Sequence, residues 1–134
     1  MLDLRSILAV LIGGGVGSVL RYLVGFWMVQ RLGAGFPWHT LAINVVGSLV
    51  IGMVGEASQV RAIGMAPVLR VFLMVGVLGG FTTFSSFSYE ALNLLGERAG
   101  WLSLAYAIGS VVLGIAAAFL GVVIVRAFAT HNAF

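Results

Sequence analysis

Four long apolar segments, separated by short polar breaks, make up most of this chain. They run from about residue 6 to 29, 37 to 55, 67 to 95 and 101 to 128. A helix needs about 20 apolar residues to cross the hydrocarbon core of a bilayer, so each segment is long enough to span a membrane. The pattern predicts an all-α integral membrane protein with four transmembrane helices, in which residues 1–134 form a single four-span unit.

The composition supports a location in the membrane. Hydrophobic residues make up 61% of the chain and charged residues only 8%, and the mean hydropathy is +1.15. A soluble domain is about 25% charged, so these values exclude a soluble enzyme and a disordered tail. The net charge of +3 comes from scattered arginines. We interpret them as headgroup contacts and orientation signals and expect no nucleic-acid partner.

The number of spans constrains the topology, because four crossings place both termini on one side of the membrane. The arginines on that side are Arg5, Arg61, Arg70 and Arg126, and those on the opposite side are Arg31 and Arg98. This excess slightly favours cytoplasmic termini and is small enough to permit insertion in both orientations. Four helices are too few to enclose a polar path, so we expect an oligomer. Because the chain has no internal repeat, inverted symmetry would require two oppositely oriented copies.

The first span contains several small residues and one arginine. Gly13 and Gly17 form a face of small residues that lets another helix approach closely. Arg21 sits several residues inside the span, where a charge is costly. It either extends to a lipid headgroup or faces a water-filled anion vestibule.

Two other spans carry rows of hydrogen-bonding side chains. In the second span Thr40, Asn44 and Ser48 are four residues apart and share one helix face. They either bond to neighbouring helices or present donors to a pore. A row of hydroxyl groups follows in the fourth span, formed by Ser103, Tyr106 and Ser110. Many donors and almost no buried carboxylate describe a path for a small anion.

The third span contains the most unusual segment, GGFTTFSSFS, which begins at Gly79 and has no Leu, Ile or Val. Its adjacent glycines, threonines and serines predict a helix that is broken near mid-membrane, at residues 79–83. Carbonyl groups freed by a break need a partner inside the protein, and a cation is a natural one. Phe81, Phe84 and Phe87 recur every three residues, either for packing or because their electropositive ring edges meet an anion.

The sequence closely resembles the Fluc (CrcB) family of fluoride channels. The resemblance rests on GGGVGSVLRY in the first span, TLAINVVGS in the second, GGFTTFSSFSYE in the third, and Tyr106 and Ser110 in the fourth. It implies a channel in the cell membrane, here the bacterial inner membrane, that exports fluoride passively and protects the cell from fluoride toxicity. It also implies an antiparallel, dual-topology homodimer with two pores. The expected partners are fluoride, the lipid bilayer and a second copy of the chain.

The resemblance further assigns roles to single residues. Asn44 would face the mouth of the pore, and Phe84 and Phe87 would contact fluoride through their ring edges. A polar track would run beside them, formed by Thr83, Ser85, Ser86, Tyr106 and Ser110.

Four more residues receive roles from the resemblance outside that track. Arg21 would lie near the aqueous vestibule, and Glu90 near the pore on the opposite side of the break. Backbone carbonyls of Gly79 and Thr82 from both subunits would hold a structural Na⁺ at the dimer interface.

Two positions depart from the pattern expected of the family. His39 stands where we expect glycine, and Ser86 replaces threonine. Neither change removes a hydrogen-bonding group from the implied pore, but both leave open the local shape at the start of the second span.

The main competing function is a small proton-coupled multidrug exporter. Such a protein needs a carboxylate in its first span, where this chain has Arg21 instead. An intramembrane enzyme is disfavoured because the chain has no HExxH or GxSxG motif and no cysteine, and because His39 and His131 fall outside the predicted core. A non-catalytic scaffold would explain the glycines but not the aligned polar faces. We therefore expect no enzymatic activity.

Overall fold

A computed structural model describes residues 3–60, 64–96 and 100–131, and almost all of them are helical. Within this part of the chain, four helical segments are long and apolar enough to cross a membrane. They are α1 (Leu4–Leu32), α2 (Trp38–Ala57), the interrupted segment Pro67–Gly96 and α6 (Gly100–His131). The predicted all-α, four-span architecture is confirmed, with boundaries within a few residues of those expected.

Local signals explain where α1 begins and ends and where the third span begins. The Asp3 side chain accepts a hydrogen bond from the Arg5 N–H at 3.2 Å and caps the start of α1. At the other end Gly33 adopts a φ of 78°, a conformation open to glycine, and its N–H donates to the Val29 carbonyl. Pro67 begins the third span, where a missing N–H costs least.

The third span consists of four helical pieces. They are α3 (Pro67–Val71), the π-helical η1 (Phe72–Leu78), α4 (Gly79–Phe81) and α5 (Phe84–Gly96). The helix is interrupted at Thr82 and Thr83, and Thr82 is extended with a ψ of 161°. The expected break therefore exists but is narrower than predicted, because Gly79 keeps helical geometry. The π-helical turns before it were not predicted.

Glycines allow the helices to approach one another closely. A side chain at Gly17 of α1 would collide with the Val77 carbonyl of η1, and one at Gly13 would crowd the Phe72 carbonyl. The predicted small-residue face is thus confirmed as a packing surface. At a second interface, between α2 and α6, a side chain at Gly121 would collide with the Leu49 carbonyl. These contacts fix the position of the third span against α1, and of α6 against α2.

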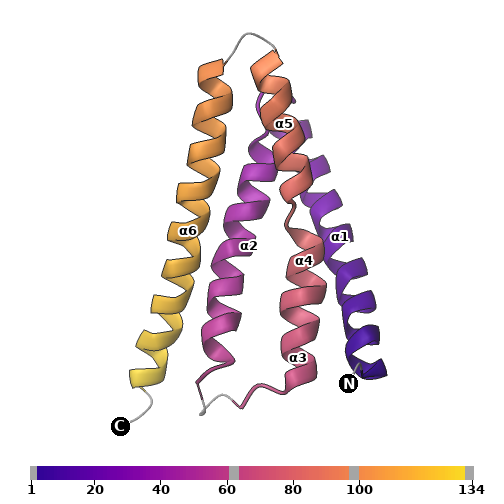
Figure 1. Ribbon diagram of the computed structural model, residues 1–134, viewed down its shortest axis with the longest axis vertical. Helices are drawn as coiled ribbons and strands as arrows, with labels where there is room; N and C mark the ends of the chain where they lie inside the picture. The colour runs from indigo at the N-terminus through magenta and orange to yellow at the C-terminus, as the bar shows by residue number, and fades with distance from the viewer. Residues whose placement is uncertain (1–2, 61–63, 97–99, 132–134) are drawn as a thin grey trace.

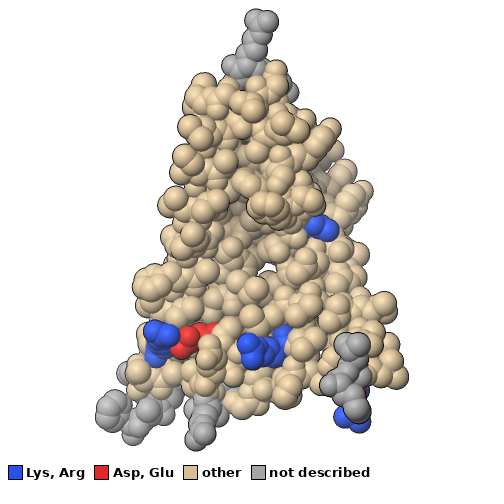
Figure 2. Space-filling model, viewed as in Figure 1, with Lys and Arg blue, Asp and Glu red and all other residues tan. Residues whose placement is uncertain are grey.

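The outside of the bundle is apolar over most of its length. Figure 1 shows the helices running along one long axis with both termini at the same end, as four crossings require. In Figure 2 most of the visible face is uncharged, and most of the charged side chains gather near that end. This is the surface of a multi-pass membrane protein. Two arginines of the count between the two sides, Arg61 and Arg98, lie outside the described residues.

Candidate functional site

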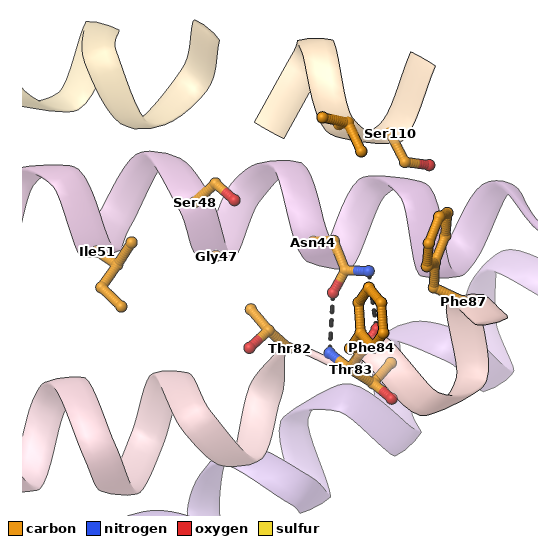
Figure 3. A pocket seen from close by; sticks show the side chains of 10 residues that line it. Asn44, Gly47, Ser48, Ile51, Thr82, Thr83, Phe84, Phe87 and Ser110 are labelled. Atoms are coloured by element: carbon orange, nitrogen blue, oxygen red, sulfur yellow. Dashed lines mark hydrogen bonds between the residues drawn. The ribbon is translucent and has the colours of Figure 1, made fainter. Parts of the chain in front are cut away.

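The break in the third span is held by the side chain of Asn44 on α2. Its Nδ2 donates to the Thr83 carbonyl at 3.0 Å, and its Oδ1 accepts from the Thr83 N–H at 2.9 Å (Figure 3). Both backbone groups of Thr83 are therefore satisfied by one amide. An unpaired backbone group in a membrane interior costs several kcal/mol, so this contact is what permits the interruption.

The other residue of the break, Thr82, is held from two sides. Its hydroxyl donates to the Leu78 carbonyl at 2.8 Å, which extends the end of α4. Its carbonyl accepts a longer bond from Arg21 Nη1 at 3.4 Å. The guanidinium of Arg21 thus reaches the break itself, a contact that neither interpretation of this arginine predicted.

A groove of about 310 Å³ opens beside the break. In Figure 3 the side chains around it come from α2, from the break and α5, and from α6. The lining residues are Asn44, Gly47, Ser48, Ile51, Thr82, Thr83, Phe84, Phe87, Ser110 and Val111. Asn44 bonds to a neighbouring helix, which was one of the two interpretations, and it also lines the groove. That it presents a donor to a pore stays a prediction.

Hydroxyl groups gather at the start of α5 and on α6. Thr83 is buried, and its Oγ1 lies 3.1 Å from Ser86 Oγ and 3.4 Å from Ser85 Oγ. Ser110 Oγ, which lines the groove, is buried and has no hydrogen-bond partner in the described part of the chain. A buried hydroxyl without a partner is costly. Its proton has no acceptor among the described residues.

Aromatic rings continue from the groove along α5. The Phe84 and Phe87 rings lie 5.6 Å apart and are tilted by 44°, and the Phe87 ring lies 5.2 Å from that of Tyr106. Phe84 is 78% exposed in the single subunit. Tilted rings at these distances turn edges as well as faces toward their neighbours.

A carboxylate with three neighbours lies one helical turn beyond Phe87. Glu90 Oε1 accepts from Thr40 Oγ1 at 2.8 Å, and Oε2 accepts from the Tyr106 hydroxyl at 2.7 Å. His39 Nε2 lies 3.4 Å from Oε1. The hydroxyls of Thr40 and Tyr106 are thus already engaged.

The structure separates the predicted site residues into those that line the groove and those that lie next to it. The groove brings together Asn44, Thr83, Phe84, Phe87 and Ser110, while Tyr106 and Glu90 lie next to it.

Three further residues lie outside the groove lining. Gly79, expected at a subunit interface, is exposed on the surface of the single subunit. Ser103, on the same face as Tyr106, donates to the Ala91 carbonyl at 2.7 Å. His39, which was expected outside the core, is 29% exposed at the start of α2 and contacts Glu90. Its position next to Thr40 in the sequence was the only available signal.

The fold and the site define a helical, multi-pass membrane protein with a polar groove at an interrupted third span. Residues 8–122 match the family described as "CrcB-like protein, Camphor Resistance (CrcB)". This chain belongs to that family.

Individual relatives support the same assignment. The "Fluoride-specific ion channel FluC" of Rhizobium meliloti (strain 1021) is 50% identical over 92% of this chain and 98% of its own length. A protein of the same name from Thermus thermophilus is 52% identical over 85% of this chain and 88% of its own. That from Agrobacterium fabrum is 48% identical over 90% and 96%. These names are those of ion channels, in agreement with the expectation that the chain is not an enzyme.

Proposed function

We propose that this protein is a subunit of a fluoride-selective channel, which lets fluoride leave the cell passively and so protects the cell from fluoride toxicity. The observation that carries the proposal is the 50% identity, over 92% of the chain, to a protein named as a fluoride-specific ion channel. The chemistry of the groove is compatible with this function, because its described lining combines apolar walls with hydroxyl and amide groups and includes no carboxylate.

Each part of the groove has a task in this proposal. A small anion leaves water only where other donors replace its hydration shell. Ser110 supplies a hydroxyl that has no partner within the described residues, and the cluster at Thr83 supplies further hydroxyls. Phe84 and Phe87 offer electropositive ring edges between apolar walls. Asn44 acts indirectly, because it holds the Thr83 backbone and with it the start of α5.

The proposal includes a second copy of the chain in antiparallel orientation. Phe84 is 78% exposed, and the groove of one subunit is open on one side. A second subunit would cover this side and complete an enclosed path. The arginine bias between the two ends is small, which suits insertion both ways up. Two variants locked in opposite orientations by added charge would then function only when produced together, and full activity of either one alone would contradict the antiparallel arrangement.

The proposal also includes a structural Na⁺ between the two copies, held by the Gly79 and Thr82 carbonyls. The residues present fit such an ion. The Thr83 N–H donates to Asn44, so the Gly79 carbonyl lacks the donor that a continuous α-helix would supply. Gly79 is also exposed on the surface of the single subunit. Carbonyl oxygens suit a hard cation. The Thr82 carbonyl accepts a bond of 3.4 Å from Arg21 and keeps a second lone pair for a cation. The ion would satisfy the Gly79 carbonyl, which hydrocarbon cannot, and it would join the copies.

Fluoride efflux from liposomes tests the proposed function. The purified protein is reconstituted, the external fluoride is measured with an electrode, and a parallel set of vesicles is loaded with chloride. We expect fluoride to leave at a rate far above that of protein-free vesicles, while chloride is retained. Equal loss of both anions, or fluoride loss no faster than from protein-free vesicles, would contradict the proposal. Proton release that depends on a cationic drug would instead support the exporter.

A further inference from the structure

Glu90 places a carboxylate next to a proposed anion path. It lies one turn beyond Phe87 on α5, and its hydrogen-bond donor Tyr106 contacts the Phe87 ring. The hydroxyls of Thr40 and Tyr106 stabilise the charged carboxylate but leave its full negative charge in place. An anion that leaves the aromatic pair therefore meets a repulsive group unless that charge is balanced.

His39 is positioned to balance it. Its Nε2 lies 3.4 Å from Glu90 Oε1, and the side chains of His39 and Glu90 are 29% and 20% exposed. His39 is the second residue of α2, beside the exposed Trp38 at the end of the span. The pair therefore lies near the end of the span, where the bilayer meets water. On α1, Gly25 lies next to the ring, since an added Cβ there would be in ordinary van der Waals contact with its Cδ2, at 3.7 Å.

Few other ionisable groups face this pair within the described residues. Glu90 of α5 contacts the imidazole directly, and Tyr106 of α6 reaches it through one hydrogen bond to Glu90. Two arginines flank Gly25 on α1. The Arg21 guanidinium donates to the Thr82 carbonyl, and the Arg31 guanidinium lies over the Trp27 ring, 5.6 Å from its centroid. His39 is therefore the cationic group placed to neutralise Glu90.

We propose that His39 is a positioning residue that controls fluoride passage through Glu90 and makes it increase with acidity. This inference rests on the proposed function. When His39 is neutral, Glu90 carries an uncompensated negative charge beside the path and slows the anion. When His39 is protonated, the imidazolium and the carboxylate form a neutral pair, and the repulsion falls. Fluoride flux therefore rises as acidification converts His39 to its charged form.

The expected size of the effect follows from electrostatics. At an effective dielectric constant of about 20, removal of one unit charge roughly 10 Å from a passing anion changes the rate of its passage by about tenfold. Both side chains are partly exposed, so screening by solvent and salt reduces the effect toward several-fold. We therefore expect fluoride flux to increase between about threefold and tenfold from pH 7.5 to pH 5.5.

The test compares three forms of the full-length protein in liposomes, with equal pH inside and outside. The wild type is measured beside His39→Gln, which keeps a hydrogen-bond donor but cannot gain a charge, and His39→Arg, which carries a permanent charge. Protein-free vesicles at each pH give the leak of hydrogen fluoride, which is subtracted. Size-exclusion chromatography checks that each variant is folded, and His39→Lys replaces His39→Arg if the latter aggregates.

We expect the wild type to accelerate on acidification, His39→Gln to be slow at every pH, and His39→Arg to be fast at every pH. A wild type whose fluoride flux does not change with pH would overturn the role of His39 and leave the proposed function intact. The same holds if His39→Gln keeps the wild-type pH profile, because the titrating group would then lie elsewhere. A wild type that carries no fluoride at any pH would overturn the proposed function and this inference with it.

Discussion

Replacement of Asn44 by alanine tests what holds the third span open. The substitution removes both hydrogen bonds to the Thr83 backbone, which measure 2.9 and 3.0 Å in the native contact. Thr83 is only 8% exposed, so water cannot replace the lost partner. Each unpaired backbone group costs about 1–3 kcal/mol. Hydrogen bonds between membrane helices often contribute only about 0.6 kcal/mol, because the surroundings rearrange.

The expected loss of stability lies between these two limits. For two groups, we expect a decrease of about 2–4 kcal/mol in the free energy of unfolding. In a chain of this size, that loss lowers the thermal midpoint by roughly 10 °C. The start of α5 also loses its anchor, so fluoride flux falls with stability. Thermal unfolding in detergent, followed by tryptophan fluorescence, measures the first effect, and liposome efflux measures the second.

Ser48→Ala is the matched control for this experiment. Ser48 lies one turn from Asn44 and lines the same groove, but no hydrogen bond of its side chain is formed within the described residues. Its replacement leaves the midpoint within about 2 °C of the wild type, as expected where no buried contact is lost. If Asn44→Ala were as stable as Ser48→Ala and as active as the wild type, the amide could not be what sustains the break.

Three further substitutions or exchanges test other parts of the account. Gly17→Ala forces a Cβ against the Val77 carbonyl and lowers the free energy of unfolding by about 2 kcal/mol or more, while Gly15→Ala, with open space in the subunit, has little effect on thermal unfolding. Ser110→Ala removes the unpaired hydroxyl and slows fluoride efflux several-fold without loss of stability, and a decrease in the thermal midpoint would contradict this. Exchange of all Na⁺ for a bulky organic cation abolishes flux or separates the dimer, and restored Na⁺ recovers it; unchanged flux and an intact dimer would refute the ion.

Much of the fold could be predicted because a bilayer constrains it strongly. The lengths of the four apolar segments correctly indicated α1, α2, the third span and α6. The small-residue face at Gly13 and Gly17 indicated a close helix contact, though not which helix would make it.

The position of the break could not be derived from one segment alone. The glycines and threonines of the third span predicted an interruption from Gly79 onward, yet Gly79 remains helical and the helix opens at Thr82. The reason is a tertiary contact, because Asn44 satisfies the Thr83 backbone from another helix. The π-helical turns of η1 lie at the close contact with α1. The sequence of the third span alone does not specify this contact, so it could not predict these turns.

The kinds of side chain at the site were predicted more accurately than their hydrogen-bond partners. Rows of donors indicated a polar surface, but the sequence could not show which donors are already engaged. Thr40 and Tyr106 both donate to Glu90, whereas the Ser110 hydroxyl has no partner among the described residues. The contact of His39 with Glu90 was missed because it joins the start of α2 to the middle of α5.

Fluoride efflux through variants of the aromatic pair tests most directly whether the groove is the path of the ion. Phe84→Ile and Phe87→Ile keep the apolar bulk of each side chain but remove the electropositive ring edge. Both are reconstituted in liposomes beside the wild type, and size-exclusion chromatography confirms that their assembly is unchanged. We expect fluoride efflux to fall by about tenfold or more in each variant, which corresponds to a loss of about 1.4 kcal/mol in stabilisation of the ion. Efflux at the wild-type rate in both variants would show that fluoride does not pass these rings.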